Sequence, residues 1–489
     1  MNLVKTGISE LDYILKGGLP AGRMLLLEGD PGTGKTSFAL QFLMEGVRQG
    51  ESVLHITLAE TLSELQEVVD SHGWSLEGIA IEELLPGEEE LTDPGAHYTM
   101  FHPSEVELGD SLRRILEKSR EVKPARIVVD SLSEIRLLAG EALRYRRQLL
   151  LLKRFFTNQD ATVLLLDDRS GSGGELHLHS LVHGVISLEQ VTPEYGSERR
   201  RLRVRKMRGR SYRGGYHDFR ISTGSLEVYP RIIDPERKVI GDGQQVLASG
   251  VKQLDALLGE GLHRTTSTLL LGPAGVGKSS VALQYAVAAA GRGEKVALFL
   301  FDEHEHTLRA RCSALNMDFD GVKESGDLIV REFVPATVTP GEIAYRLHRL
   351  IKDQGVSVFV LDSLNGYINA MPGQSYLMIQ LHELLTVLAR SGVTTLMLGA
   401  QHGILGSDLD SPVDASYLCD TLILFRFFEA EGQVRRAVSV VKKRSGVHEQ
   451  TIRELKLRPG GLEVGPALED FQGVLSGQPQ FKGSRKPLL

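Results

Sequence analysis

Short apolar runs that end near a glycine or an aspartate alternate along the chain with longer segments of helical period. In the first half, apolar runs typical of buried strands occupy residues 23–29, 52–58, 126–130, 162–168 and 183–190. In the second half, similar runs occupy residues 267–273, 295–301, 357–362, 394–400 and 420–428. Helical segments follow the first strand of each half, at residues 36–50 and 279–293. This alternation predicts an α/β fold in which a mostly parallel sheet carries helices on both faces.

The two halves are copies of one pattern. GISELDYIL at Gly7 recurs as GVKQLDALL at Gly250, a shift of 243 residues, and TVLLLDD at Thr162 resembles TLMLGAQ at Thr395. We therefore expect two tandem domains, at residues 1–235 and 246–475. The boundary falls near residues 230–245, where Pro, Gly and charged residues interrupt the apolar period. Residues 476–489 are polar and broken by Pro and Gly, which predicts a disordered tail.

Composition narrows the class of protein. A chain of 489 residues exceeds the usual size of one hydrophobic core, and its 42% hydrophobic and 24% charged residues are typical of globular proteins. No apolar run is long enough for a membrane helix, and the start of the chain lacks the pattern of a secretory signal. The two cysteines, Cys312 and Cys419, lack metal-ligand spacing. We expect a cytoplasmic protein.

Both halves contain a phosphate-binding loop. Residues 29–36 (GDPGTGKT) and 272–279 (GPAGVGKS) satisfy the pattern G-x-x-x-x-G-K-[ST] between an expected strand and an expected helix. Glycines allow backbone N–H groups to close around phosphate oxygens at a helix N-terminus. Lys35 and Lys278 would hold the β- and γ-phosphates of ATP, and Thr36 and Ser279 would ligate Mg²⁺. The complete predicted loops are Gly29, Asp30, Pro31, Gly32, Thr33, Gly34, Lys35 and Thr36, and Gly272, Pro273, Ala274, Gly275, Val276, Gly277, Lys278 and Ser279.

Two pairs of acidic residues complete the predicted chemistry. Asp130 and Asp362 each end an apolar strand, where an aspartate joins the Mg²⁺ shell of such ATPases or, alternatively, only caps a turn. Glu60 and Glu303 follow the strand after the loop helix and would orient or deprotonate the attacking water, although surface glutamates are common.

The most basic segment of the chain permits three interpretations. Residues 199–213 hold nine basic and no acidic residues, although the whole chain carries a net charge of −7, which argues against a surface that binds nucleic acid throughout. The run could be a solvated face, a nucleic-acid stripe, or a strand that directs Lys206 and Arg208 to a neighbouring subunit's ATP. Because Lys442 and Arg444 repeat this pair in a less basic context, the third interpretation is favoured.

Five histidines fall in two groups, at positions 177, 179 and 183 and at positions 304 and 306. No cysteine or carboxylate cluster completes either set as a metal site, so structural histidines are the favoured interpretation.

Together these features resemble the KaiC family, whose members carry two RecA-like ATPase domains and form double-ring hexamers with ATP between subunits. The resemblance extends from Gly7 to about Phe471 and is most specific in GDPGTGKT, in the two cation pairs, in GGYHDFRI and in VKKRSGVHEQTIREL. HPSEVELG, DSLSEIRLL and DSLNGYINAMPG look closest to the bacterial branch outside the cyanobacterial clock.

The resemblance implies residue roles. Glu60 and Glu303 match the second of the family's paired catalytic glutamates, while the first is replaced by Ala59 and Asp302, which puts hydrolysis by the first domain in doubt. Lys206, Arg208, Lys442 and Arg444 match cations that reach the neighbouring subunit's nucleotide. Ser416 and Tyr417 occupy the segment in which the family's second domain is phosphorylated, with Ser416 the better acceptor.

These expectations give one leading hypothesis and two alternatives. The leading hypothesis is a homohexameric, Mg²⁺-dependent ATPase with serine/threonine autokinase potential, which acts as a nucleotide-driven switch toward a signalling partner, away from membranes and nucleic acid. A RecA-like DNA-binding motor would instead show DNA-stimulated hydrolysis. A regulatory scaffold stabilised by nucleotide would bind ATP without turnover.

Overall fold

The computed structural model describes residues 2–84, 103–169, 175–193, 196–232, 245–369, 376–401, 416–475 and 479–482. The chain divides into two compact units, the first formed by residues 1–194 and 198–231 and the second by residues 195–197 and 232–489. Most of the predicted boundary segment, residues 233–244, lies outside the described residues. Among the described residues no helix has the length and apolar character needed to cross a membrane.

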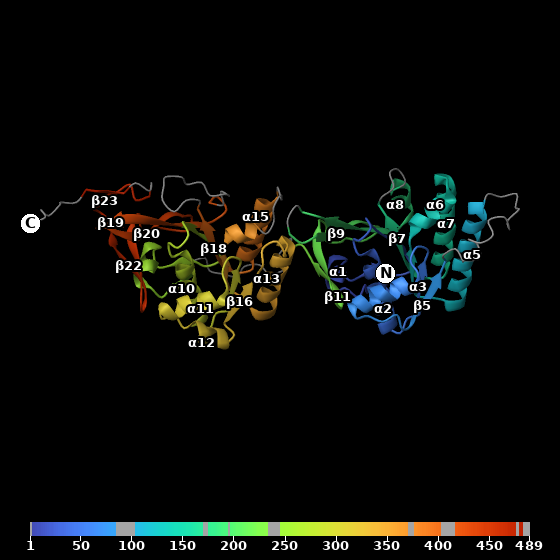
Figure 1. Ribbon diagram of the computed structural model, residues 1–489, viewed down its shortest axis with the longest axis horizontal. Coiled ribbons are helices and arrows are strands. Elements are labelled where there is room, and N and C mark those ends of the chain that lie inside the picture. Colours follow the sequence, from blue (N-terminus) through green and yellow to red (C-terminus); the bar gives the residue numbers. More distant parts are fainter. Residues whose placement is uncertain are drawn as a thin grey trace, which may run out of the picture. The chain divides into compact units, whose positions relative to one another are not determined.

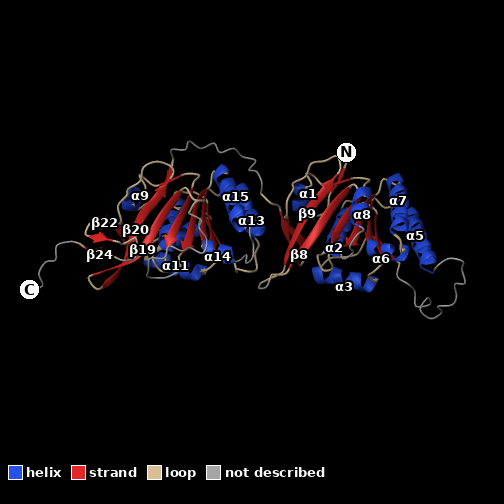
Figure 2. Ribbon diagram, turned by 90° about the horizontal axis from the view of Figure 1, so that it is seen from above, coloured by secondary structure: helices blue, strands red, loops and turns tan. Residues whose placement is uncertain are grey.

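Within the described residues, the first unit is built on a nine-stranded sheet of order β11-β10-β9-β8-β3-β7-β6-β4-β5 (Figures 1 and 2). Strands β8, β3, β7, β6, β4 and β5 are parallel, and β9, β10 and β11 extend one edge in antiparallel order. Their bounds are β3 Met24–Gly29, β4 Val53–Thr57, β5 Ile79–Glu83, β6 Arg126–Asp130, β7 Thr162–Asp168, β8 Gly184–Val191, β9 Arg199–Met207, β10 His217–Ser222 and β11 Ser225–Tyr229. The short strands β1 Leu3–Val4 and β2 Leu19–Pro20 pair separately.

Helices cover both faces of this sheet because its central strands are apolar on both sides. Alternate strand residues face two separate cores, one under α1 and α2 and the other under α5, α6, α7 and α8 (Figure 1). The helices of this unit are α1 Ser9–Ile14, α2 Lys35–Arg48, α3 Leu62–His72, α5 Pro103–Val122, α6 Leu132–Ala139, α7 Ala142–Asn158 and α8 Glu175–Leu181.

The second unit repeats this architecture. In its described part, nine strands follow the order β16-β15-β17-β18-β14-β19-β20-β21-β22, parallel as far as β19 and antiparallel from β20. The strands are β14 Ser267–Gly272, β15 Val296–Leu300, β16 Leu328–Glu332, β17 Val358–Asp362, β18 Thr394–Ala400, β19 Thr421–Ala430, β20 Gln433–Lys443, β21 Arg453–Arg458 and β22 Gly461–Ala467, with the short pairs β12 Val246–Leu247 and β13 Leu262–His263, and β23 Phe471–Gln472 and β24 Gln480–Phe481. The helices are α9 Lys252–Leu257, α10 Lys278–Ala290, α11 Glu305–Ala314, α12 Phe319–Glu324, α13 Pro340–Gln354, α14 Leu364–Asn369 and α15 Leu377–Arg390. The predicted fold, two tandem α/β domains with mostly parallel sheets, is confirmed.

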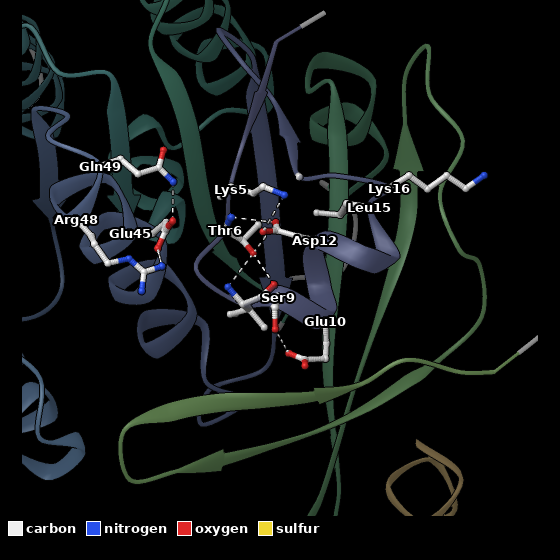
Figure 3. A network of polar contacts seen from close by, with 12 residues as sticks. Lys5, Thr6, Ser9, Glu10, Asp12, Leu15, Lys16, Glu45, Arg48 and Gln49 are labelled. Carbon is white, nitrogen blue, oxygen red and sulfur yellow. Dashed lines mark hydrogen bonds and ion pairs between the residues drawn. The ribbon is translucent and has the colours of Figure 1, made fainter. Parts of the chain in front are cut away.

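A small polar network at the start of the first unit (Figure 3) has a counterpart in the second unit. In the first unit the backbone N–H and hydroxyl of Thr6 both donate to Asp12 Oδ1 at 3.0 Å, which fixes the turn before α1. In the second unit Ser249 N donates to Asp255 Oδ1 at 2.8 Å. These residues are related by the same shift of 243 positions, so the duplication extends to individual hydrogen bonds.

The sheet register corrects one detail of the repeat. The sequence comparison aligned Asp168 with Gln401, but Asp168 pairs with Gly29 across β7 and β3, and Ala400 pairs with the equivalent Gly272 across β18 and β14. Asp168 and Ala400 are therefore the equivalent residues.

Candidate nucleotide site

Each phosphate-binding loop connects the carboxyl end of a central strand to the start of a helix. β3 leads through residues 29–34 into α2, and β14 leads through residues 272–277 into α10. Gly34 and Gly277 precede these helices with φ of 95° and 107°, a conformation that favours glycine, and no side chain caps either helix. The first N–H groups of both helices therefore have no side-chain acceptor among the described residues and could bind an anion.

The loop lysines are folded back onto their own loops. Lys35 Nζ donates to Gly29 O at 2.9 Å and to Asp30 O at 3.1 Å, and it forms an ion pair with Asp168 Oδ1 at 2.7 Å. In the second unit Lys278 Nζ donates to Gly272 O at 2.8 Å and to Pro273 O at 2.7 Å. Burial lowers the pKa of Lys278 to about 8, although Asp362 opposes this shift.

The predicted Mg²⁺ ligands lie together in both units. Thr36 Oγ1 donates to Asp130 Oδ2 at 3.0 Å, and Ser279 hydrogen-bonds Asp362. Burial raises the pKa of Asp130 to about 7, with Glu60 adding to the shift, and raises that of Asp362 to about 6, with Glu303 adding to it. A buried carboxylate beside a hydroxyl fits Mg²⁺, which takes few protein ligands and completes its shell with water and phosphate.

Glu60 approaches the same loop in the first unit. Its backbone N–H donates to Thr57 Oγ1 at 3.0 Å at the carboxyl end of β4, the strand next to β6. Burial raises the pKa of Glu60, as does Glu64, while Lys35 and a hydrogen bond from Thr36 lower it. One oxygen, Oε2, is buried and has no hydrogen-bond partner among the residues that the structure describes. The carboxylate therefore has an oxygen available for a water or substrate proton.

In the second unit both candidate carboxylates already have partners. Glu303 forms an ion pair with Arg311 on α11, and Asp302 accepts a hydrogen bond from Ser363 Oγ. Both carboxylates raise the pKa of Asp362. The structure therefore brings Asp302 and Glu303 to the predicted metal position, but in a more tightly paired arrangement than that of Glu60.

Most of the basic run is strand β9, and two of its arginines have acidic partners on other strands of the sheet. Arg201 forms an ion pair with Glu189 at 2.9 Å and lies over the Tyr216 ring at 4.1 Å, and Arg205 lies 3.2 Å from Glu28 Oε1. These two pairs reduce the positive charge that β9 could offer to a phosphate backbone.

The repeated cation pairs lie near the amino ends of the parallel strands, whereas the phosphate-binding loops lie at the carboxyl ends. Lys206 Nζ donates to His179 O and Val182 O, and His183 N donates to Met24 O at the amino end of β3. The six-residue strand β3 separates this point from the phosphate-binding loop by roughly 17 Å.

The second unit repeats this arrangement. Lys442 Nζ donates to Cys419 O at 2.7 Å, and Asp420 N donates to Ser267 O at the amino end of β14. The arginines follow the same pattern, because Arg208 donates to Ser180 O and Arg444 donates to Tyr417 O. No cation of these pairs can reach its own unit's loop.

The candidate phosphorylation segment is held by the second pair of cations. Ser416 O accepts a hydrogen bond from Lys442 Nζ at 2.9 Å, and the Tyr417 side chain is 56% exposed. The equivalent carbonyls in the first unit belong to His179 and Ser180. Ser180 is thus the first unit's structural counterpart of Tyr417, and His179 that of Ser416.

One histidine of each predicted group pairs with a glutamate. His179 Nε2 lies 2.6 Å from Glu28 Oε2, and His304 Nδ1 lies 3.0 Å from Glu332 Oε2. In the part of the chain that the structure describes, no group of three potential metal-ligating side chains occurs. The side chain of His177 lies outside the described residues.

Two residues at these sites escaped the sequence analysis. Asp168 contacts Lys35 only because β7 lies next to β3, and Arg311 contacts Glu303 only because α11 folds back on the loop that contains Glu303. Neither residue belongs to a repeated motif, since their counterparts are Ala400 and Val68.

Comparison with known proteins agrees with the duplicated architecture. The family model described as "ATPase: KaiC" matches residues 4–232 and again residues 247–469. The circadian clock protein KaiC3 of Synechocystis sp. is 25% identical over 98% of this chain and 94% of its own length. The circadian clock oscillator protein KaiC of Thermostichus vulcanus is 25% identical over 97% of this chain and 91% of its own length, and that of Synechococcus elongatus is 24% identical over the same shares.

Proposed function

The chain belongs to the KaiC family of ATPases, and on this premise we propose that both units bind and hydrolyse Mg²⁺·ATP in pockets that a neighbouring copy of the chain completes. The observation that carries the proposal is the placement of the repeated cations. In each unit the loop lysine lies at the carboxyl ends of the parallel strands, and the lysine amino group of the cation pair lies at their amino ends.

A contact between copies follows from this separation. Because a lysine side chain is far shorter than the strand between its two ends, Lys206 and Lys442 would act on the nucleotide of another chain and not on their own. Supplying cations from a second chain is an established way to stabilise charge during phosphoryl transfer. Activity would then depend on assembly, and we propose a homohexamer with nucleotide between subunits, by analogy with the family.

The chemistry would be in-line attack of water on the γ-phosphate. Lys35 and Lys278 would leave their loop carbonyls to bind phosphate oxygens, and the cations of the neighbouring chain would stabilise the charge that develops. Mg²⁺, held by Thr36 and Asp130 or by Ser279 and Asp362, would neutralise phosphate charge. Glu60 in the first unit and Glu303 in the second would accept the proton of the nucleophile.

For the second unit we also propose autophosphorylation at Ser416. Its backbone is tied to Lys442, the cation assigned to the neighbouring ATP, so the hydroxyl and the donor phosphate would meet at the same contact between chains. Tyr417 is the weaker candidate because its hydroxyl extends further from the backbone. Slow hydrolysis and phosphorylation would together make the assembly a nucleotide-driven switch toward a signalling partner. The relatives' names refer to circadian clocks, but a timekeeping role is not part of this proposal.

Single-site variants test the ATPase proposal. In a Lys278→Ala background only the first unit can bind ATP, and Glu60→Gln should then lower phosphate release about 100-fold with little change in nucleotide affinity. Lys35→Ala with Glu303→Gln tests the second unit in the same way. Bound ATP without turnover in either single-site protein would favour the scaffold alternative, and turnover that requires single-stranded DNA would favour the motor.

Phosphosite mapping tests the kinase proposal. After incubation with Mg²⁺·ATP, mass spectrometry should find phosphate on Ser416, and Ser416→Ala should remove it. Ser180→Ala is the matched control, because Ser180 occupies the equivalent segment of the first unit. Labelling that persists in Lys278→Ala would contradict phosphorylation by the second unit.

A further inference from the structure

Lys35 and Lys278 differ in how many of their ammonium N–H donors have an acceptor among the described residues. A lysine ammonium has three N–H donors. In the first unit all three have acceptors, namely Gly29 O, Asp30 O and the carboxylate of Asp168. In the second unit Lys278 has two carbonyl acceptors and, among the described residues, no third one.

The difference comes from one position of the sheet. Asp168 ends β7 directly opposite Gly29, and Ala400 ends β18 directly opposite Gly272. The two backbones are held alike, because Asp168 N donates to Ser133 Oγ at 3.3 Å and Ala400 N donates to Asn365 Oδ1 at 2.7 Å. At this position of the sheet, therefore, only the first unit carries a carboxylate that pairs with its loop lysine.

From this arrangement we propose that Asp168 competes with the phosphate groups of the nucleotide for Lys35 and so weakens ATP binding by the first unit. A phosphate oxygen can bind Lys35 Nζ only if an existing contact breaks, and the Asp168 carboxylate is the acceptor that resembles it in charge and hydrogen-bonding capacity. The Lys35 side chain is 9% exposed and that of Asp168 28%, so water screens this ion pair only in part.

The competition links occupancy of the first unit to displacement of Asp168 from Lys35, so a higher ATP concentration is needed to fill this unit than if the ion pair were absent. This inference rests on the proposed function, since it requires that both loops bind nucleotide.

The test measures the affinity of each unit separately with Mg²⁺ and a fluorescent, non-hydrolysable ATP analogue (mant-AMP-PNP). In the Lys278→Ala background, Asp168→Asn should tighten binding by the first unit roughly tenfold, the scale of one charged contact. In the Lys35→Ala background, Ala400→Asp should weaken binding by the second unit to a similar extent.

A control separates competition for Lys35 from a general effect of charge. Asp167 is one residue away and pairs with Arg136 instead of Lys35, so Asp167→Asn should change the affinity less than twofold. Thermal unfolding checks that each variant remains folded, and the Ala400→Asp arm stands even if Asp168→Asn does not fold. Equal or weaker binding by Asp168→Asn, or unchanged binding by Ala400→Asp, would overturn the inference while leaving the ATPase proposal intact. Absence of binding in both single-lysine backgrounds would overturn both.

Discussion

Arg311 on helix α11 forms an ion pair with Glu303, the candidate catalytic carboxylate of the second unit. The first unit has Val68 at the equivalent position of α3, and its carboxylate, Glu60, keeps one buried oxygen without a partner. The two units thus share a loop and a candidate Mg²⁺ position but differ in how far the candidate catalytic carboxylate is restrained.

Replacing Arg311 by valine should make the second unit resemble the first. In the Lys35→Ala background, Arg311→Val should raise steady-state ATP hydrolysis about threefold to tenfold, because Glu303 no longer has to leave an ion pair to accept a proton. The control is Arg309→Val on the same helix, since Arg309 pairs with Glu305 and Asp320. A fall in rate would mean that Arg311 holds Glu303 in its productive position.

Mixing two inactive variants should restore activity if the cations act between chains. One chain carries Lys206→Ala and Arg208→Ala, the other carries Lys35→Ala, and both carry Lys278→Ala so that only first-unit pockets count. An equal mixture, dissociated and reassembled, should recover about one quarter of the parental ATPase rate, because that share of contacts pairs an intact loop with intact cations. No recovery in a properly sized assembly would refute action between chains.

His55 should make the first unit sensitive to acid. It is fully buried in β4, both ring nitrogens lack partners, and burial lowers its pKa to about 4. Above about pH 6.5 the imidazole is neutral in both the folded and the unfolded state. As the pH falls from there toward 4, only the unfolded state gains the proton, so the folded unit loses roughly 3 kcal/mol.

His55→Leu should remove that loss. The second unit has Leu298 at the equivalent position, so the substitution suits this strand. Denaturant unfolding between pH 7.5 and 4.5 should show a shallower decline for the variant than for the wild type. Parallel declines would contradict a neutral, buried His55.

Two buried arginines should respond oppositely to replacement by methionine. Arg126 is inaccessible but donates to Phe42 O and Lys5 O and pairs with Glu51, whereas Arg426 leaves Nε and Nη2 buried without partners. Arg126→Met should destabilise the first unit by about 3 kcal/mol. Arg426→Met should leave the second unit's stability unchanged or raise it by up to about 2 kcal/mol. Thermal unfolding measures both changes, and marked destabilisation by Arg426→Met would reveal a missing anionic partner.

Much of the fold could be predicted because its sequence pattern occurs twice in the chain. A motif that occurs at the same place in both halves is stronger evidence than a single copy. This applies to the two loops, to Asp130 and Asp362, and to the cation pairs. The alignment of Asp168 was wrong by one position because Thr394 and Thr395 are adjacent, so that either threonine could match Thr162. Only the hydrogen-bond register decides between them.

The contacts of Lys35 with Asp168 and of Glu303 with Arg311 could not be predicted from sequence. Each joins elements whose proximity depends on strand order or on the direction in which a helix folds back. The ion pairs of Arg201 and Arg205 were hidden for the same reason, since their partners Glu189 and Glu28 lie on β8 and β3, far from β9 in the chain.

Each phosphate loop is separated from its own cation pair by the length of a strand. This separation affects how many pockets are complete in an assembly. If every pocket takes its cations from the next chain, a linear assembly always ends in one chain whose loops receive none. A closed ring has no such end, so all of its pockets are complete. Loss of a single subunit would therefore inactivate the pockets of the chain before it as well as its own. On dilution, the total ATPase rate would fall more steeply than the protein concentration.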